Sequence, residues 1–402
     1  WPSKTRLFFL LFIEPQRNFM GDLLPRYHLD NPSHFVRKLN EVLEQAVLAL
    51  GQAWCIDPNE LLAAHGKLAA QDDYLNHLTH ASYTNDDFIV HGRDHQRLQS
   101  MTPPGALYGG YEAVPRVLEA IVQRVFDALA ILRQEDAIKL IVIDLDDTLW
   151  RGIAAEEETP PWEMIEGWPL GLAEALLVFK ARGGLLAIAS KNDEAVAREH
   201  FDRIFYGRLR LDDFASIQIN FERKSSNIRQ ILKDVNVLSK NTLFIDDNPR
   251  EIEEVKGSFP EMRTLSREHL DWRRIILTSP QTQVASLSAE SLRRSELVQA
   301  SIEREKSQEG LSKEEWLRSL QLRQRHSLVA HLKAPDFERA LELLNKTNQF
   351  NTTGKRWSPQ ELGDLFANGG YLLCAFLQDR IVDNGLISVA VVRDACIEQV
   401  VL

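Results

Sequence analysis

The chain has few cysteines, which narrows the classes of protein that it can represent. Its 402 residues include only Cys55, Cys374 and Cys396, and these lie far apart in the sequence. No pair has the short spacing of a zinc or redox motif, so a cysteine-based site of either kind is excluded. Disulfides form in oxidising compartments, and so few cysteines predict a reducing one, which we expect to be the cytoplasm.

Long apolar runs and an excess of positive charge are also absent. The apolar run nearest the start, Leu7–Ile13, is too short to span a bilayer and leads into Glu14-Pro15, so it predicts a strand rather than a signal peptide. The formal net charge of −11 argues against a general nucleic-acid binder. We therefore expect neither a membrane nor a nucleic acid as partner, and an anionic ligand needs a local positive site.

One region is rich in histidine, but it lacks the spacing of a metal site. The residues concerned are His65, His77, His80, His91 and His95. No H-E-x-x-H pattern links them, so exposed or helix-capping histidines are favoured over zinc ligands. The same region has no Gly-Asp-Ser nucleophile motif.

The central stretch of the sequence is Lys139–Trp150, KLIVIDLDDTLW. Its apolar run, Leu140–Ile143, is typical of a strand buried on both faces of a parallel sheet. Asp144 and Asp146 follow directly, at the end where open α/β sheets place their ligands. Two close carboxylates repel unless a cation is bound between them, and oxygen ligands favour Mg²⁺. The alternative is an Asp-rich turn that only caps the next helix.

Two further segments repeat this pattern of an apolar strand ending in polar residues. Leu185–Asn192, LLAIASKN, ends in Ser190, and Thr242–Pro249, TLFIDDNP, ends in Asp246 and Asp247. Lys224 is the first residue of a helix predicted between them, over 224–235. Asn192 and Asp193 are equally well explained as helix caps, and Asn248-Pro249 as a helix start.

Taken together and in this order, these segments resemble the four motifs of the haloacid dehalogenase (HAD) superfamily of phosphoryl-transfer enzymes. The strings DLDDTLW, SKND and FIDDNP resemble in particular the FkbH-like proteins of HAD subfamily IIIC. This resemblance implies a Rossmann-like parallel sheet with helices on both faces. The gaps between the motifs leave no room for a sizeable cap domain, so we expect an open site, with residues 156–169 as a flap beside it.

The resemblance also implies roles for the site residues. Asp144 is expected to be the nucleophile and Asp146 the general acid and base. Ser190 and Lys224 are expected to bind the phosphate, with Lys191 as a helper and Asn192 and Thr148 in support. Mg²⁺ is expected to bind the Asp144 carboxylate, the Asp146 backbone carbonyl and Asp247. Asp246 is expected either to bind the metal directly or to contact one of its ligands.

The FkbH-like proteins are associated with removing phosphate from 1,3-bisphosphoglycerate and loading the glyceryl unit onto an acyl carrier protein. The first functional hypothesis is therefore an enzyme of this kind, with a phosphorylated small molecule and a carrier protein as partners. A simple Mg²⁺-dependent phosphatase is the second hypothesis, and a non-catalytic scaffold is the third.

At this length about two or three domains are expected. Residues 1–135 are predicted to form a partial α/β domain that resembles SGNH hydrolases, and residues 136–280 the HAD-like domain. Residues 281–320 are predicted to be a helical linker with a solvated charged face. Residues 321–402 resemble the first half of a GNAT acetyltransferase-like α+β domain.

Overall fold

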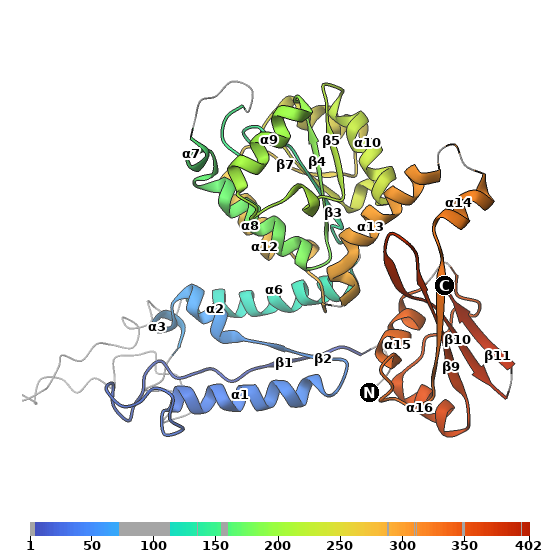
Figure 1. Ribbon diagram of the computed structural model, residues 1–402. Helices are drawn as coiled ribbons and strands as arrows, with labels where there is room; N and C mark the ends of the chain where they lie inside the picture. The colour runs from blue at the N-terminus through green and yellow to red at the C-terminus, as the bar shows by residue number, and fades with distance from the viewer. Residues whose placement is uncertain are drawn as a thin grey trace, which may run out of the picture. The chain divides into compact units, whose positions relative to one another are not determined.

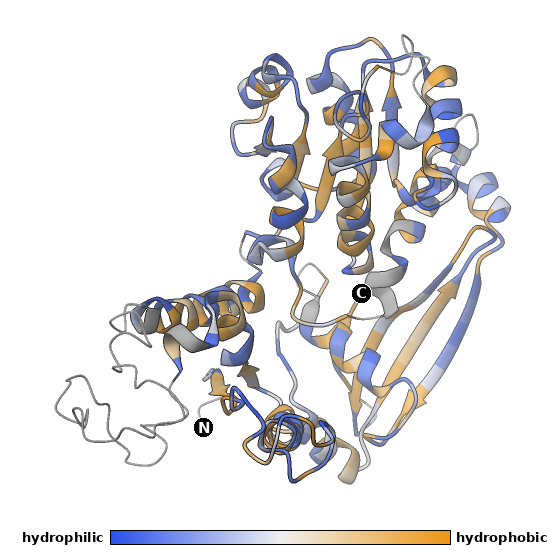
Figure 2. Ribbon diagram, turned by 90° about the vertical axis from the view of Figure 1, so that its left-hand side faces the viewer, coloured by the Kyte–Doolittle hydropathy of each residue, from blue (hydrophilic) through white to orange (hydrophobic). Residues whose placement is uncertain are grey.

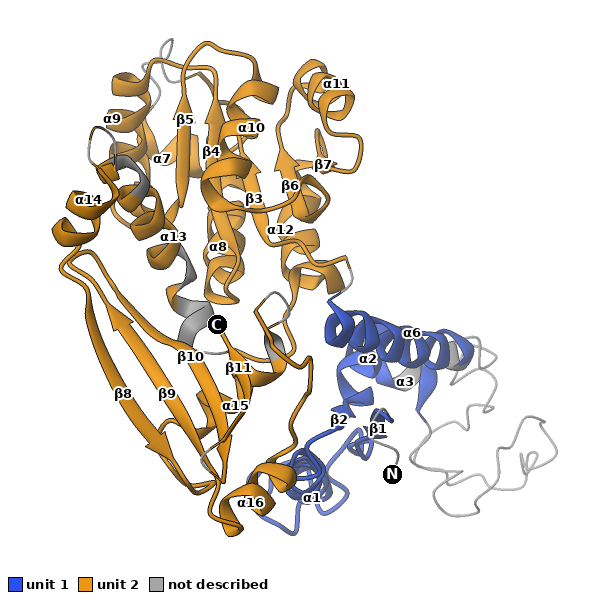
Figure 3. Ribbon diagram, turned by 90° about the vertical axis from the view of Figure 1, so that its right-hand side faces the viewer, with its two compact units in different colours: residues 1–135 blue, residues 136–402 orange. Residues whose placement is uncertain are grey.

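The structure is a computed structural model that describes residues 5–71, 113–134, 136–153, 160–287, 289–308, 310, 312–347, 350–394 and 396–402. It divides into two compact units, residues 1–135 and 136–402 (Figure 3). His77, His80, His91 and His95 lie outside the described residues, as does the 154–159 part of the loop that contains the predicted flap. No helix in the described part of the chain is both long and apolar enough to cross a membrane.

The first unit is built on a β-α-β crossover. Its elements are β1 (Leu7–Leu10), α1 (Pro32–Leu48), β2 (Ala53–Ile56), α2 (Pro58–His65), α3 (Lys67–Ala70) and α6 (Ala113–Arg133). The strands β1 and β2 pair in parallel, with Leu7 opposite Ala53. Asp57 caps α2, since its side chain accepts a hydrogen bond from the Asn59 backbone N–H.

The second unit contains the predicted parallel sheet. Its strands are β3 (Leu140–Ile143), β4 (Leu185–Ser190), β5 (Ser216–Ile219), β6 (Thr242–Ile245) and β7 (Arg263–Leu265). They pair in the order β5-β4-β3-β6-β7, and every pair is parallel. The α/β class is therefore confirmed, and β3 lies at the centre, flanked by the other two motif-bearing strands (Figure 1).

Helices cover both faces of this sheet. They are α7 (Pro161–Ile165), α8 (Trp168–Ala181), α9 (Glu194–Phe205), α10 (Lys224–Val235), α11 (Pro249–Ser258) and α12 (His269–Thr278). Successive residues of β3 point to opposite faces of the sheet. Ile141 and Ile143 pack in the core that α8, α9 and α12 cover. Leu140 and Val142 pack in the core that α10 and α11 cover. All four are fully buried, which explains the unbroken apolar run (Figure 2).

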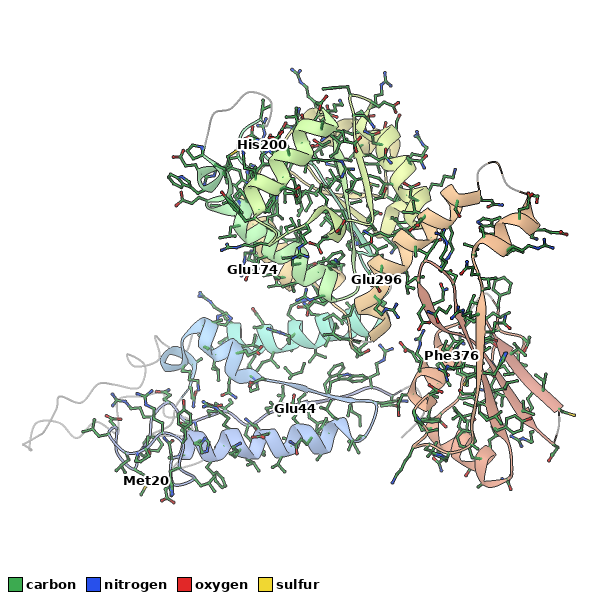
Figure 4. All side chains as sticks on the ribbon, viewed as in Figure 1. Met20, Glu44, Glu174, His200, Glu296 and Phe376 are labelled. Atoms are coloured by element: carbon green, nitrogen blue, oxygen red, sulfur yellow. The ribbon has the colours of Figure 1, made fainter. Side chains whose placement is uncertain are left out.

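The sequence did not predict α7 and α12. Helix α12 is held against α8 by Arg273, whose guanidinium lies 2.8 Å from the carboxylate of Glu174 (labelled in Figure 4). Its Trp272 is fully buried and donates a hydrogen bond to the Ser266 carbonyl. Together with the fully buried Ile276, Trp272 places one side of α12 in the core of the sheet domain.

The C-terminal part of the second unit forms an antiparallel sheet. Its strands are β8 (Arg323–Val329), β9 (Tyr371–Gln378), β10 (Asp383–Arg393) and β11 (Cys396–Val401), in the order β11-β10-β9-β8. Helices α15 (Phe337–Lys346) and α16 (Pro359–Ala367) share a core with it. On β8, Arg325 lies 3.7 Å from the ring centroid of Phe376 (Figure 4).

The segment between the two sheets consists of α13 (Ala289–Gln308) and α14 (Lys313–Ser319). The predicted solvated charged face is present on α13, where Arg293 and Glu296 are exposed, but the other side of the helix is packed against the domain. Ala300 is buried, Val298 packs against the core below α10 and α11, and Gln299 donates hydrogen bonds to the carbonyls of Asp212 and Phe214. Helix α13 is therefore docked on the parallel-sheet domain through these residues, and near its end Arg304 is ion-paired at 2.6 Å with Asp379.

Candidate active site

The polar residues predicted from three separate segments meet at one edge of the parallel sheet. Asp144 follows β3, Ser190 ends β4 and Asp246 follows β6. The Asp144 N–H donates to the Ile245 carbonyl, which continues the strand pairing up to the first carboxylate. Because the strands are parallel, their carboxyl ends lie side by side, and this edge is where such sheets bind ligands.

Lys224 lies between two of the carboxylates. It is the first residue of α10, and its Nζ lies 2.6 Å from Asp144 Oδ1 and 2.7 Å from Asp246 Oδ2. The Lys224 residue is 2% exposed and Asp246 is fully buried. A buried ammonium between two buried carboxylates is stable only as a group, because removing any one charge leaves the others unpaired.

The electrostatics of this group shift its proton affinities. Burial lowers the pKa of Lys224, but the charges of Asp144 and Asp246 outweigh it, so the net shift is upward. Burial and the charge of Asp144 raise the pKa of Asp246 to about 6. The same two causes, burial first, raise the pKa of Asp247. The three carboxylates therefore carry more negative charge than Lys224 alone neutralises.

This excess of negative charge fits a cation. Carboxylate oxygens of Asp144, Asp246 and Asp247 all lie within 4.8 Å of one another. Asp144 Oδ1 is buried and has no partner in hydrogen-bonding alignment among the described residues, although Lys224 is close. A hard divalent cation is the ligand that such a set of oxygens suits. The carboxylate of Asp146 is not in the set, and its predicted backbone ligand stays a prediction.

Asp146 is oriented by two donors instead. Its Oδ1 accepts a hydrogen bond of 2.9 Å from the Trp150 indole N–H, and its Oδ2 accepts one of 2.9 Å from the Asn192 amide. The Asn192 Oδ1 in turn accepts the Asp193 backbone N–H. Asn192 thus holds the carboxylate, while Asp193 caps α9 through the N–H of Val196.

The remaining predicted residues divide into two groups. Thr148 is fully buried and contacts Asp247, and Ser190 is 1% exposed at the end of β4. Lys191, in contrast, is ion-paired at 2.7 Å to Glu251 of α11. The structure thus brings Thr148 into the cluster and directs Lys191 to a neighbouring acid, so a phosphate-binding role for Lys191 requires that this pair open.

Sequence reasoning missed several residues beside the site. Trp150 is one, although its position four residues after Asp146 is a signal, since a turn brings the two together. His269 is another: its Nε2 lies 3.3 Å from the Asp147 carbonyl, and its ring is 4.6 Å from that of Trp168 and 4.4 Å from that of Trp272. No local pattern marks His269, because it reaches the Asp147 loop from a distant helix.

Comparison with known proteins adds structural likenesses of low score. No protein-family model matches the chain, and no curated protein matches it. The N-terminal part of the protein BF1531 from Bacteroides fragilis, which contains a phosphatase domain and was solved with Mg, is 24% identical over 70% of this chain and 68% of its own, with a TM-score of 0.48.

Two smaller solved proteins align over less of the chain. The 3-deoxy-D-manno-octulosonate 8-phosphate phosphatase from Moraxella catarrhalis, solved with magnesium, phosphate and KDO, is 14% identical over 42% of this chain and 91% of its own, with a TM-score of 0.22. A HAD-superfamily (subfamily III A) hydrolase from Legionella pneumophila is 14% identical over 45% of this chain and 97% of its own, with a TM-score of 0.23. With scores this low, the function of the chain has to be inferred from its own residues.

Proposed function

We propose that the chain is a Mg²⁺-dependent phosphohydrolase of the HAD type. The observation that carries this proposal is the position of Lys224 between Asp144 and Asp246, with Asp247 completing a three-carboxylate set. A buried charge cluster of this kind is costly to fold, and it lies at the ligand-binding edge of the sheet. A scaffold protein has no use for such a cluster, so the enzymatic hypotheses are preferred.

In the proposed reaction, a carboxylate oxygen of Asp144 attacks phosphorus and the bond from phosphorus to the ester oxygen breaks. Asp146, in its protonated form, gives its proton to the leaving oxygen. Water then attacks the phosphorus of the aspartyl phosphate while Asp146 takes a proton from it. Inorganic phosphate leaves, and both carboxyl groups return to their starting states.

The neighbouring groups supply charge neutralisation and orientation. Lys224 supports the negative oxygens of the phosphoryl group, and Ser190, at the adjacent strand end, donates to them. Asn192 and Trp150 keep the Asp146 carboxyl group in one orientation. Mg²⁺, held by Asp144 and Asp247 with Asp246 beside them, supplies positive charge that offsets the charge of the phosphate.

We further propose that the substrate is an acyl phosphate such as 1,3-bisphosphoglycerate and that the acceptor is an acyl carrier protein. The support for this finer proposal is the likeness of DLDDTLW, SKND and FIDDNP to FkbH-like proteins. In this proposal the sulfur of the carrier's own thiol attacks the acyl carbon, and the acyl phosphate leaves as inorganic phosphate. The Asp144 reaction removes the other phosphate of the substrate from its ester oxygen. Cys374 is buried, and burial raises its pKa to about 11, so it is not suited to relay the acyl group.

The experiment is phosphate release from a general phosphomonoester, with and without Mg²⁺, by the chain and by Asp144→Asn. We expect phosphate release to require Mg²⁺ and the Asp144 carboxylate. The rate of release by Asp144→Asn should be lower by more than about a thousandfold. The matched control is Asp271→Asn, which removes a half-buried carboxylate of α12 that, among the described residues, is paired only with Arg274 of the same helix, and it should retain full activity. Equal release by the chain and by Asp144→Asn would overturn the proposal.

The finer proposal is tested by intact-protein mass spectrometry of a carrier protein. The carrier is incubated with the chain, Mg²⁺ and 1,3-bisphosphoglycerate that is generated in situ. A glyceryl mass increment that is absent with Asp144→Asn supports the acyl transfer. Phosphate release without the mass increment would support the phosphatase activity and contradict the acyl transfer.

A further inference from the structure

The first unit contains a cavity at the start of α1. It has a volume of about 350 Å³ and is lined by residues of the loop 16–27 and by Asn31, Ser33, His34 and Arg37. Met20, labelled in Figure 4, belongs to this loop. The loop leaves β1 and enters α1, and β1 is parallel to β2, so the cavity lies where the carboxyl end of a parallel strand meets the beginning of a long helix.

This place in the fold favours a negative ligand. The first turn of a helix presents backbone N–H groups without intrahelical acceptors, together with the positive end of the helix dipole. In α1 one of these groups, the Ser33 N–H, already donates a hydrogen bond of 3.0 Å to the Asn31 side-chain oxygen. Helix starts that follow parallel strands are recurrent phosphate sites, but a helix start alone does not make one.

Positively charged side chains around the cavity also favour an anionic ligand. Three arginines line the cavity, Arg17, Arg26 and Arg37, against one acid, Asp22. Arg37 is held by Glu14 through two hydrogen bonds of 3.1 and 2.6 Å. Arg17 and Arg26 have no ion pair among the described residues, and both are exposed on the loop. Two guanidinium groups are thus free to bind an anion in the bidentate way that arginine favours.

His34 lines the cavity and has one ring nitrogen that is not hydrogen-bonded to any residue that the structure describes. Its Nδ1 is buried and has no hydrogen-bond partner in the described part of the chain. Its ring lies edge-on to Tyr27, with 5.9 Å between the centroids, and both residues line the cavity. Because Nδ1 itself is not accessible to solvent, His34 contributes the face of its ring to the wall of the cavity and reports on a ligand bound there, rather than bonding to it through Nδ1.

We propose that this cavity binds a small phosphorylated compound, with Arg17, Arg26 and the first turn of α1 holding the phosphate and the His34 ring lining the site. The volume suits a small metabolite rather than a polymer. The site lies in the unit that does not contain the proposed active site, and it does not depend on the function proposed there.

The test is NMR of the full chain with isotope-labelled histidine, titrated with inorganic phosphate in the absence of Mg²⁺. The His34 ring signals, assigned with His34→Gln, should shift to saturation with phosphate and not with chloride at equal ionic strength. Arg26→Gln should weaken the apparent affinity by about tenfold or more, because it removes a charged hydrogen bond. Arg116→Gln, which changes an exposed arginine of α6 outside the cavity, should leave it unchanged.

Two results would overturn this proposal. One is a His34 shift that chloride reproduces, since this would reflect ionic screening; the other is an unchanged affinity in both Arg26→Gln and Arg17→Gln. The variant Asp144→Asn separates the two proposals. It should retain the His34 response even if phosphohydrolase activity is absent from the chain.

Discussion

Thr148 and Asp247 exchange two hydrogen bonds although they are 99 residues apart in the sequence. The Asp247 N–H donates to Thr148 Oγ1 at 3.1 Å, and the Thr148 hydroxyl donates to Asp247 Oδ1 at 3.3 Å. Thr148 is fully buried, and its own carbonyl accepts from the Trp168 indole N–H. One hydroxyl thus sets the backbone and the carboxylate of Asp247 relative to the loop that carries Asp144.

Replacing this hydroxyl should weaken metal binding. In Thr148→Val the shape is kept but Asp247 loses both partners, and losing such an orienting contact typically costs 10-fold to about 100-fold in metal affinity. We expect the Mg²⁺ concentration for half-maximal phosphate release to rise by about that factor. Thr148→Ser retains the hydroxyl and should behave like the original chain. An unchanged Mg²⁺ dependence in Thr148→Val would show that the contact does not position Asp247.

Lys224 should matter for stability as well as for activity. Lys224→Gln leaves Asp144 and Asp246 buried without their cation, and breaking a buried ion pair typically costs about 3–5 kcal/mol. Urea unfolding in EDTA should show a loss of this order, while Lys240→Gln, an exposed lysine, should show none.

A double variant distinguishes charge from packing as the cause. Lys224→Gln combined with Asp144→Asn has one buried carboxylate fewer, so it should be more stable than Lys224→Gln alone. If the two variants are equally unstable, the lysine acts through packing of its side chain and the electrostatic account is wrong.

Asp379 should contribute to stability in a manner that depends on pH. Although burial raises its pKa, hydrogen bonds from the Val382 and Ile381 N–H groups and from Arg304 outweigh it, so the pKa is lowered. A lowered pKa in the folded state adds stability above the unfolded value of 3.8, and this stability is lost as the pH falls through the folded pKa.

The variant Asp379→Asn should therefore be less stable than the original chain at pH 7, by about 2 kcal/mol. The difference should begin to shrink below pH 3.8, where the carboxylate of the unfolded chain takes up a proton, and should be lost once the pH has fallen through the lower pKa of the folded chain. Urea unfolding of both chains across this range measures it. A difference that stays constant with pH would mean that the charge of Asp379 is not responsible.

Two of the cysteines, Cys396 and Cys374, should react with thiol reagents at different rates. Cys396 is exposed on β11, whereas Cys374 is buried in β9 with its pKa raised to about 11 by burial. Only the thiolate reacts, so Cys396 should be labelled rapidly and Cys374 only after unfolding. Labelling of Cys396→Ser, followed by peptide mass spectrometry, checks this. Fast labelling of Cys374 in the folded chain would contradict the buried position of β9.

Much of the parallel-sheet domain follows from the sequence alone. The run Leu140–Ile143 faces cores on both sides of the sheet, so every residue has to be apolar, and such a run is visible without a structure. The same holds for the apolar residues Leu185–Ala189 of β4 and Leu243–Ile245 of β6. Since parallel strands align their carboxyl ends, the meeting of Asp144, Ser190 and Asp246 was also predictable.

The tertiary structure alone decided the partners of each side chain. Lys191 and Lys224 are both lysines at the sheet edge, yet Lys224 is buried between two carboxylates and Lys191 is paired with Glu251. Neighbouring sequence does not distinguish them, because the position of α11 decides which acid Lys191 reaches. His269 and the cavity beside His34 likewise depend on packing between segments distant in the chain, which periodicity cannot register. Local patterns thus determine which residues form strands and where these end, while long-range packing determines which of them touch.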